Sequence, residues 1–386
     1  MRAEAPGLVS RIIIMAIAQA ASAVSSEFKH ISLELTNICN LHCSYCARDD
    51  DALYHTPANF FSVELLRRII RSARHPACGF NSISFTGGEV TIHPHFKEIV
   101  ETVREEGWQF GFVTNGWHFD RVYPTLLANR EALHVVAFSL DGPTRETHDF
   151  WRGEGSFVRV MRAITRCYMK GLPFVIKAGI RRDTLPLLEQ FTLLSARLGA
   201  QALHFSHLLP TSSGAEDASG LNIEERAHAE QEIGALSNIF KMKIGVATGY
   251  YNLDPAPPCN ALQGRNCNID YRGRLTLCCN LSGYRGAAEE TDVVADLTQE
   301  DFAEGFMRLR QLITQQVERR RRALEEIVRQ GVEPDLYTAS PCLYCLQSFG
   351  KIPWHKSVEL KSRSLPVLSM TAPSATSAVY LSQESI

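Results

Sequence analysis

Residues 35–46 read LTNICNLHCSYC and place Cys39, Cys43 and Cys46 at a C-x3-C-x2-C spacing. Apolar and polar side chains alternate over residues 31–35, so we predict a short strand that enters a loop at this point. Three thiolates on one loop can bind three irons of a cubane cluster and leave the fourth iron without a protein ligand. An open coordination position is what a cluster needs to bind and activate a small molecule. The stretch therefore predicts an iron–sulfur site at the end of the first strand.

Two other interpretations of the three cysteines are weaker. A zinc knuckle needs four ligands, and the nearby His42 and His55 lack the pairing of a zinc finger. A disulfide would use two of the three clustered thiols and leave one over. The spacing favours a cluster over both.

The loop resembles that of the radical S-adenosylmethionine (radical SAM) superfamily, which carries an aromatic residue just before its third cysteine, here Tyr45. The resemblance implies that Cys39, Cys43 and Cys46 hold a [4Fe-4S] cluster on which S-adenosylmethionine binds. It also implies that the Tyr45 ring lies near the adenine of that nucleoside.

Composition places the chain among globular proteins with one large domain and a smaller one: 386 residues, 45% hydrophobic and 21% charged. Its formal charge of -2 gives no overall field that favours nucleic acid or an acidic membrane, so neither is expected as a partner. Eleven cysteines would be at risk of scrambled disulfides in an oxidising compartment, so we expect a cytoplasmic protein.

The N-terminus, residues 1–27, imitates a signal peptide, because Arg2 and Arg11 precede an apolar run at 12–18. We interpret it instead as an amphipathic helix packed on the first strand, since an oxygen-sensitive cluster assembles in the cytosol. No later run approaches the length of a transmembrane span.

Strand and helix patterns alternate regularly after the cysteine loop. Helical spacing begins at residue 63 behind a likely N-cap, Ser62. The predicted strands that follow the first are 83–85, 110–113, 135–140, 174–180 and 203–208, separated by helices that include 96–105, 157–168 and 187–198. Six such steps predict an α/β fold with a parallel sheet, a partial (β/α)6 TIM-like barrel over residues 28–214, with ligands at the carboxyl ends of its strands.

The suspected motifs fall at those strand ends. The second strand leads into Gly87, Gly88 and Glu89, where two glycines let backbone approach a ligand closely. In the radical SAM family this segment holds the amino and carboxylate groups of S-adenosylmethionine, usually with proline next, whereas this chain has Val90. A simple glycine turn is the alternative.

Two further strand ends carry candidate nucleoside contacts. Asn115 follows the third strand, and Ser139 and Asp141 close the fourth. The resemblance implies that Ser139 and Asp141 hydrogen-bond ribose hydroxyls, although either residue could merely cap the following turn. Residues 148–157, HDFWRGEGSF, resemble a segment of the family's peptide-modifying branch, with Arg152 and Gly153 at the expected places.

A second cysteine region follows a Ser-, Gly- and Ala-rich linker and a helix, residues 215–250. Cys259, thirteen residues, Gly273, Cys278 and a later Cys342-x2-Cys345 resemble the SPASM and twitch extensions of radical SAM enzymes. A full SPASM domain would continue with a cysteine where this chain has Lys351, so the resemblance implies one auxiliary [4Fe-4S] cluster within residues 251–356. Cys267 is a possible substitute ligand, and a structural zinc ribbon at the same thiols is the alternative.

The remaining features are expected to be structural. Cys78 and Cys167 are interpreted as small buried hydrophobes, and Cys279 as pointing away from its ligating neighbour. A long helix over 302–330 carries four consecutive arginines, 319–322, which usually form a solvated face. The tail, 357–386, is interpreted as disordered.

The resemblance implies that one electron from the cluster cleaves S-adenosylmethionine to a 5′-deoxyadenosyl radical, which abstracts hydrogen from the substrate. The expected function is oxidative modification of a ribosomally made peptide, with an electron donor such as flavodoxin or ferredoxin. The alternatives are a dehydrogenase or epimerase of a small metabolite and, from another class, a non-catalytic iron–sulfur or zinc protein. The substrate and the hydrogen abstracted are not predicted.

Overall fold

The computed structural model describes residues 29–48, 51–211, 220–285 and 290–355. The predicted helix in 1–27 and the predicted disordered tail, 357–386, lie outside these ranges. Among the described residues, no helix combines the length and the apolar character that crossing a membrane requires.

In the described part of the chain, ten strands form one sheet in the order β10-β9-β8-β1-β2-β3-β4-β5-β6-β7. Neighbours from β8 through β1 to β7 pair in parallel, and β9 pairs antiparallel with both β8 and β10. The strands are β1 His30–Thr36, β2 Ser82–Gly87, β3 Gln109–Thr114, β4 Leu133–Ser139, β5 Phe174–Ile180, β6 Ala202–His207, β7 Lys243–Thr248, β8 Asn266–Ile269, β9 Arg274–Thr276 and β10 Val293–Asp296.

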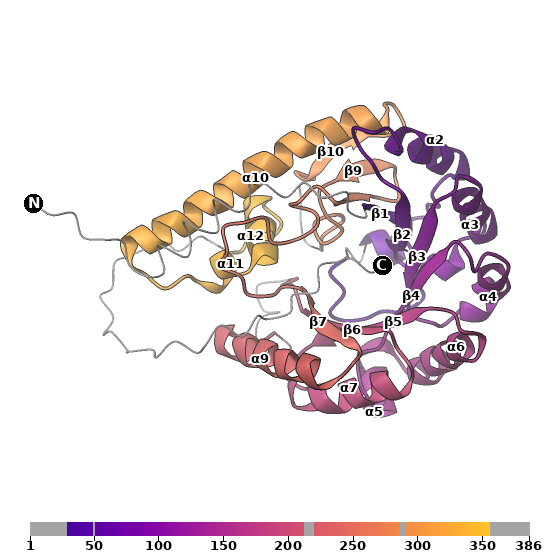
Figure 1. Ribbon diagram of the computed structural model, residues 1–386, viewed down its shortest axis with the longest axis horizontal. Coiled ribbons are helices and arrows are strands. Elements are labelled where there is room, and N and C mark those ends of the chain that lie inside the picture. Colours follow the sequence, from indigo (N-terminus) through magenta and orange to yellow (C-terminus); the bar gives the residue numbers. More distant parts are fainter. Residues whose placement is uncertain (1–28, 49–50, 212–219, 286–289, 356–386) are drawn as a thin grey trace, which may run out of the picture.

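Helices connect the parallel strands and lie outside the curved sheet (Figure 1). They are α2 Val63–Ala73, α3 Phe96–Glu105, α4 Phe119–Ala128, α5 Arg145–Arg152, α6 Ser156–Lys170, α7 Leu188–Arg197 and α9 Ile223–Ile239, and shorter turns at Asp51–His55, Val90–Ile92 and Leu185–Leu187 complete this part. The C-terminal part adds α10 Phe302–Gln330, α11 Leu336–Ala339 and α12 Pro341–Ser348. Ser62 caps α2 as predicted, because its side chain accepts a hydrogen bond from the backbone N–H of Leu65.

The predicted α/β class and partial barrel are confirmed, and all six predicted strands form within two residues of their expected bounds. The sheet also continues past both ends of the predicted barrel. Residues 215–250, interpreted as a linker and a helix, also contain β7, which pairs with β6 and whose Ile244 and Val246 are buried. On the other side β8 pairs with β1, so one sheet runs from the barrel into residues 251–356. The division into separate domains stays a prediction.

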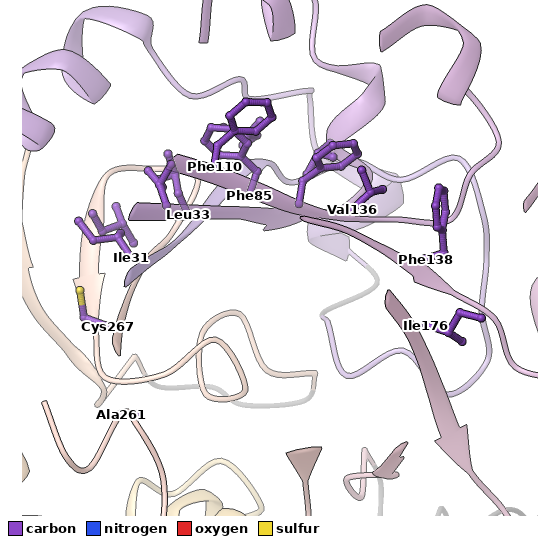
Figure 2. Close-up of a cluster of buried hydrophobic side chains, with 14 of the residues drawn as sticks. Ile31, Leu33, Phe85, Phe110, Val136, Phe138, Ile176, Ala261 and Cys267 are labelled. Carbon is purple, nitrogen blue, oxygen red and sulfur yellow. The ribbon is translucent and has the colours of Figure 1, made fainter. Parts of the chain in front are cut away.

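The two faces of the sheet have different side chains. The outer face carries large apolar residues that pack beneath the helices, among them Ile31, Phe85, Phe110, Phe138 and Ile176 (Figure 2). The inner face carries a small apolar group of Val135, Ala137, Val175 and Ala202. The rest of the inner face is largely polar, so the barrel encloses a cavity of about 110 Å³ instead of a packed apolar centre.

Helix α10 buries one of its four consecutive arginines. Arg320 is 2% exposed and donates hydrogen bonds to the backbone carbonyls of Asn252 and Asp254. Arg321 and Arg322 pair with Glu318 on the same helix. The prediction of a solvated face is therefore wrong for Arg320, because four successive positions cover all sides of a helix and one of them must face inward.

Candidate active site

The cysteine loop begins where β1 ends and is held by contacts to the segment that follows it. The Asn37 side chain donates to the Pro57 carbonyl at 3.2 Å and accepts from the Asn59 N–H at 2.7 Å. The Tyr54 hydroxyl donates to the Leu41 carbonyl at 2.6 Å, and the Tyr54 ring stacks on His42. These contacts hold the loop against residues 54–59. They also give His42 a packing role in place of metal binding.

The three thiols of this loop are half-buried, and the Cys46 N–H donates to the Cys43 carbonyl at 3.0 Å. Burial, reinforced by the Glu89 carboxylate, raises the pKa of Cys39 to about 12. Burial also raises the pKa of Cys43. A bound metal cluster would supply the positive charge that keeps such thiols deprotonated, so this donor set fits an iron–sulfur cluster.

The two glycines at the end of β2, Gly87 and Gly88, pack directly against the cysteine loop. The Gly88 N–H donates to the Thr36 carbonyl and the Glu89 N–H to the Ile38 carbonyl, both at 2.9 Å. A Cβ atom on Gly88 would lie 1.8 Å from the Ile38 carbonyl oxygen. Gly87 has a φ of +122°, and a Cβ atom there would lie 2.5 Å from the Thr36 carbonyl oxygen. Both glycines are therefore required for the end of β2 to pack against the cysteine loop, and this requirement does not depend on any contact with a ligand.

We expect Gly88→Ala to destabilise the protein by about 3 kcal/mol, the upper end of the usual cost of overpacking. The obstructing atom is backbone, so no side-chain rotation can relieve the overlap. Urea unfolding of the purified variant measures the effect. Gly234→Ala is the control, because its Cβ would meet nothing within 4 Å inside α9 and should leave stability equal or higher by up to about 1 kcal/mol. Equal unfolding midpoints for Gly88→Ala and the wild type would contradict the packing argument.

Glu89 joins the ends of β2 and β3. Its buried carboxylate accepts hydrogen bonds from the Thr91 hydroxyl at 2.6 Å, the Thr114 hydroxyl at 2.7 Å and the Asn115 N–H at 2.8 Å. The Asn115 side chain in turn donates to Asn40 in the cysteine loop at 3.0 Å. The structure thus brings together the ends of three strands that the sequence predicted to meet. The expected contact of Glu89 with a ligand amino group stays a prediction.

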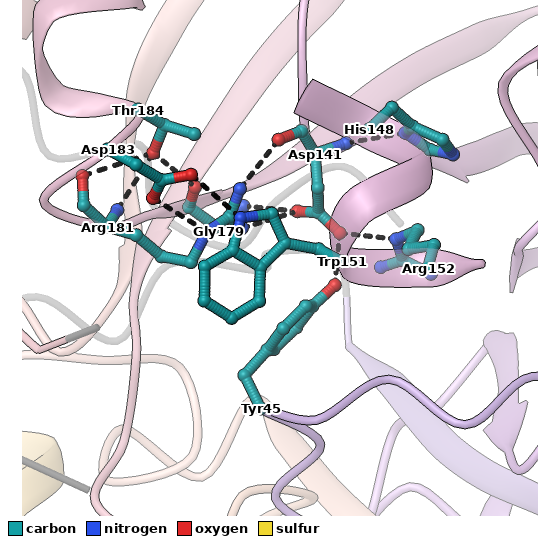
Figure 3. A network of polar contacts seen from close by, with 9 residues as sticks. All are labelled: Tyr45, Asp141, His148, Trp151, Arg152, Gly179, Arg181, Asp183 and Thr184. Carbon is teal, nitrogen blue, oxygen red and sulfur yellow. Dashed lines mark hydrogen bonds and ion pairs between the residues drawn. The ribbon is translucent and has the colours of Figure 1, made fainter. Parts of the chain in front are cut away.

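Asp141, after β4, is the centre of a buried polar network (Figure 3). The residue is 1% exposed, and its carboxylate accepts from the Tyr45 hydroxyl, from Arg152 Nε and from the Gly179 N–H at 2.8 Å. Burial alone would raise the pKa of Asp141, but the Arg152 and Arg181 guanidinium groups outweigh it and leave the pKa well below its usual value. Asp141 therefore stays ionised and orients Tyr45. Its expected ribose contact stays a prediction.

Arg181 is a site residue that the sequence analysis did not find. It is fully buried, donates to the Asp141 carbonyl at 2.8 Å, and places its guanidinium group 4.4 Å from the Trp151 ring centre and 5.5 Å from that of Tyr45. No motif marks Arg181 in the sequence, because its partners come from three other segments. Ser139 is half-buried at the end of β4 and pairs in register with Lys177 of β5.

The second group of thiols also comes together. Cys259 precedes β8, Cys278 follows β9, and Cys342 and Cys345 are one turn apart in α12. The β8–β9 hairpin turns at Gly273, which has a φ of +88°, as the sequence predicted. Cys259 acts electrostatically on Cys278, Cys342 and Cys345, so the four thiols share one neighbourhood. Burial raises the pKa of Cys342 to about 12, so these thiols too would need a cationic centre to be deprotonated.

Cys267 does not lie with this group. It is fully buried on β8 beside Ile31, in the core of the sheet (Figure 2), and burial raises its pKa far above the usual value. This position favours Cys259 over Cys267 as the ligand. Cys279 does not point away from Cys278 as predicted, because the two thiols hydrogen-bond with each other. Cys279 also lines the barrel cavity beside Lys177.

Neither group of thiols is gathered tightly enough for a single ion. Over the described ranges, no three Cys, His, Asp or Glu side chains are placed to hold one metal ion. Thiolates that bind different irons of a cubane stand farther apart than thiolates on one ion, so wider spacing is compatible with clusters. Cys78 and Cys167 are buried in the core, as expected.

Residues 33–184 match the family model of the radical SAM superfamily. The matched region starts in β1 and ends just after β5, and it contains the whole cysteine loop, Glu89, Asn115 and the Asp141 network. The resemblance drawn from the cysteine loop is confirmed by this match.

Several relatives share this region. Mycofactocin maturase MftC of Mycobacterium tuberculosis is 29% identical over 64% of this chain and 63% of its own. An AdoMet-dependent heme synthase of Nitratidesulfovibrio vulgaris is 30% identical over 54% of each chain. GTP 3',8-cyclase of Vibrio cholerae is 28% identical over 73% of this chain and 85% of the cyclase. The chain thus spans just under two thirds of the maturase and about half of the heme synthase.

Solved structures share the fold at low sequence identity. Streptococcus suis SuiB bound to S-adenosylmethionine superposes with a TM-score of 0.59 at 13% identity, over 77% of this chain and 69% of SuiB. Native anSMEcpe with bound AdoMet superposes with a TM-score of 0.58 at 16% identity, over 75% of this chain and 84% of its own. The fold is therefore found in other proteins over about three quarters of this chain.

Proposed function

We propose, from the premise that residues 33–184 are a radical SAM domain, that this chain reductively cleaves S-adenosylmethionine and abstracts hydrogen from a ribosomally made peptide, which it modifies oxidatively. The observation that carries the proposal is the packing of the Cys39–Cys43–Cys46 loop against Gly87, Gly88 and Glu89. That packing joins a trithiol site to the strand ends where a nucleoside would bind.

Each residue at these strand ends has a proposed role. Cys39, Cys43 and Cys46 would hold a [4Fe-4S] cluster, which when bound supplies the electron that cleaves S-adenosylmethionine to methionine and a 5′-deoxyadenosyl radical. Gly87, Gly88, Glu89, Asn115 and Ser139 would surround the amino acid and ribose portions. Tyr45, held by Asp141, would lie against the adenine, and the closed network around Asp141 would exclude water from that side.

The second thiol group would hold an auxiliary [4Fe-4S] cluster. Cys259, Cys278, Cys342 and Cys345 supply four ligands, so no iron is left open to bind substrate directly. Electron transfer or structural support are the roles that remain. The buried Arg320 lies near Cys345 and Cys259 and would stabilise their negative charge. A flavodoxin or ferredoxin of the cytoplasm is the proposed electron donor.

A peptide substrate is supported by two relatives and one segment. The maturase relative is named for mycofactocin, and SuiB has also been solved bound to its precursor peptide SuiA. Residues 148–157, HDFWRGEGSF, resemble in sequence a segment of the peptide-modifying branch of the radical SAM family. A small metabolite is the second candidate, favoured by the GTP 3',8-cyclase match, which covers 85% of that enzyme.

The test incubates reduced protein, reconstituted with iron and sulfide, with S-adenosylmethionine and peptides encoded by short reading frames beside its gene. The expected result is 5′-deoxyadenosine together with a peptide that has lost hydrogen, as dehydrogenation or a cross-link would leave it. Mass spectrometry measures both. A parallel reaction contains GTP in place of the peptides, and release of 5′-deoxyadenosine with conversion of GTP but of no peptide would favour the second candidate.

In the same assay, the double variant with Cys342→Ala and Cys345→Ala is expected to keep releasing 5′-deoxyadenosine, while its rate of peptide conversion falls at least tenfold. The reason is that these two thiols belong to the second group, in α12, whereas the Cys39–Cys46 loop follows β1. Circular dichroism checks that the fold is intact. Full peptide conversion by this variant would show that the second group plays no part in the chemistry.

A further inference from the structure

The cavity inside the barrel is lined by polar side chains that the proposed chemistry has not used. They come from the inner faces of most of the parallel strands, and the principal ones are His30, Ser84, Thr86, Lys177, His204 and Thr248. No aspartate or glutamate is among the described residues that line it. Glu34, the carboxylate on the inner face of β1, is held by Arg48 at 2.7 Å. Among the described residues, the cavity therefore contains a cationic side chain and no carboxylate.

Lys177 supplies that positive charge. It lies in the middle of β5, and over the described residues its side chain makes no hydrogen bond to a carboxylate and no ion pair. Among the described residues, the acidic group that acts on it is the Cys279 thiol, which lines the same cavity and whose own pKa Lys177 helps to lower. Burial lowers the pKa of Lys177, so keeping the lysine here costs free energy that an anion would recover.

His204 is the second unused group. It pairs in register with Lys177 across β5 and β6, is only 4% exposed, and has no hydrogen-bond partner at Nε2. Burial, together with Lys177, lowers its pKa to about 3, so the imidazole is neutral and offers a hydrogen bond without a charge. A buried polar atom without a partner is uncommon, and one that faces a cavity points to a ligand.

The cavity adjoins the proposed nucleoside site. Thr86 immediately precedes Gly87, Val113 lies two residues before Asn115, and both line the cavity. Ser139 pairs in register with Lys177, which pairs with His204, so the three residues form one row across β4, β5 and β6. A molecule bound in the cavity would thus lie next to S-adenosylmethionine, where a substrate must be.

We propose that Lys177 and His204 bind a carboxylate group of the substrate inside the barrel. A single ammonium beside a neutral imidazole and hydroxyl groups matches a monoanion, whereas a phosphate dianion is usually bound by several cations or by arginine. The carboxylate of a peptide is either its C-terminus or an Asp or Glu side chain. The assignment of this carboxylate to a peptide rests on the proposed function. The carboxylate site itself rests only on the cavity and its side chains.

The test measures binding of capped amino acids to the reconstituted protein saturated with S-adenosylmethionine, by ligand-observed NMR titration. Two pairs of probes are used, each an acid and its amide. N-acetyl-alanine and N-acetyl-alanine amide represent a C-terminal carboxylate. N-acetyl-glutamate α-amide and N-acetyl-glutamine α-amide represent a side-chain carboxylate. Loss of a charge-assisted hydrogen bond costs about tenfold in affinity or more, so at least one acid should bind at least tenfold more tightly than its amide. The pair that shows the difference identifies the source of the carboxylate.

Lys177→Met should remove the preference for the acid, and Lys177→Arg should retain part of it. Lys170→Met is the matched control, since Lys170 is an exposed lysine at the end of α6, and it should keep the full preference. Lys177→Gln replaces Lys177→Met if the latter folds poorly. Circular dichroism and iron content check that each variant is folded and holds its clusters.

Three results would overturn the proposal: no binding of either acid, equal binding of acid and amide by the wild type, or an unchanged preference in Lys177→Met and Lys177→Gln. Weaker binding of S-adenosylmethionine with an unchanged acid preference would assign Lys177 to that molecule instead. These outcomes differ from a failure of the proposed function, in which acid preference persists but no peptide is converted.

Discussion

The Cys39→Ala, Cys43→Ala, Cys46→Ala variant is expected to release no 5′-deoxyadenosine and to hold about half the iron of the wild type. Two [4Fe-4S] clusters correspond to about eight irons per chain, and the variant should keep about four. The physical reason is that all ligands of the proposed first cluster come from one loop, whereas the second thiol group is built from β8, β9 and α12. Iron analysis and chromatography of the reaction products measure the two quantities.

Cys167→Ala is the control for this variant, because Cys167 is buried in α6 among apolar side chains and should keep the full iron content. Loss of all iron from the triple variant would mean that the two thiol groups depend on each other. About four irons with one zinc in the wild type would replace the auxiliary cluster by a zinc ribbon.

Asp141→Ala is expected to destabilise the protein by about 3–5 kcal/mol, the usual cost of leaving a buried charge without its partner. The substitution removes the counter-charge of Arg152 and Arg181 at once and leaves the Tyr45 hydroxyl and the Gly179 N–H without an acceptor. Urea unfolding measures the loss. Because the pKa of Asp141 is lowered by folding, its contribution is complete above the unfolded value of about 4 and declines as the pH falls below that.

Asp183→Ala tests whether the effect is specific to the buried network. Asp183 also pairs with Arg181, at 3.3 Å, but its side chain is 45% exposed, so the expected loss is below about 1 kcal/mol. Equal losses from the two substitutions would contradict a special role for burial. Loss of 5′-deoxyadenosine release in Asp141→Asn, at near-normal stability, would connect the network to the orientation of Tyr45.

The sequence by itself determined the features that depend on neighbouring residues. Alternation of apolar side chains predicted six strands, because burying one face of a strand requires a period of two. The C-x3-C-x2-C spacing predicted the loop, and the glycines at 87 and 88 predicted a close backbone approach. The order of strands and helices then placed these motifs at one edge of a parallel sheet, which the structure confirms.

Only the tertiary structure decided which distant residues meet. Lys243–Thr248 is a short strand with a glycine at its centre, and its pairing with β6 comes from contacts across the chain instead of a local pattern. The position of Cys267 depends on the pairing of β8 with β1, which puts this thiol in the core and favours Cys259 as the proposed ligand. Arg181 reaches the Asp141 carbonyl across 40 residues of sequence. Lys177 faces the barrel interior beside His204 because the register of β5 and β6 puts them in one row, and register is fixed by long-range packing that local periodicity does not encode.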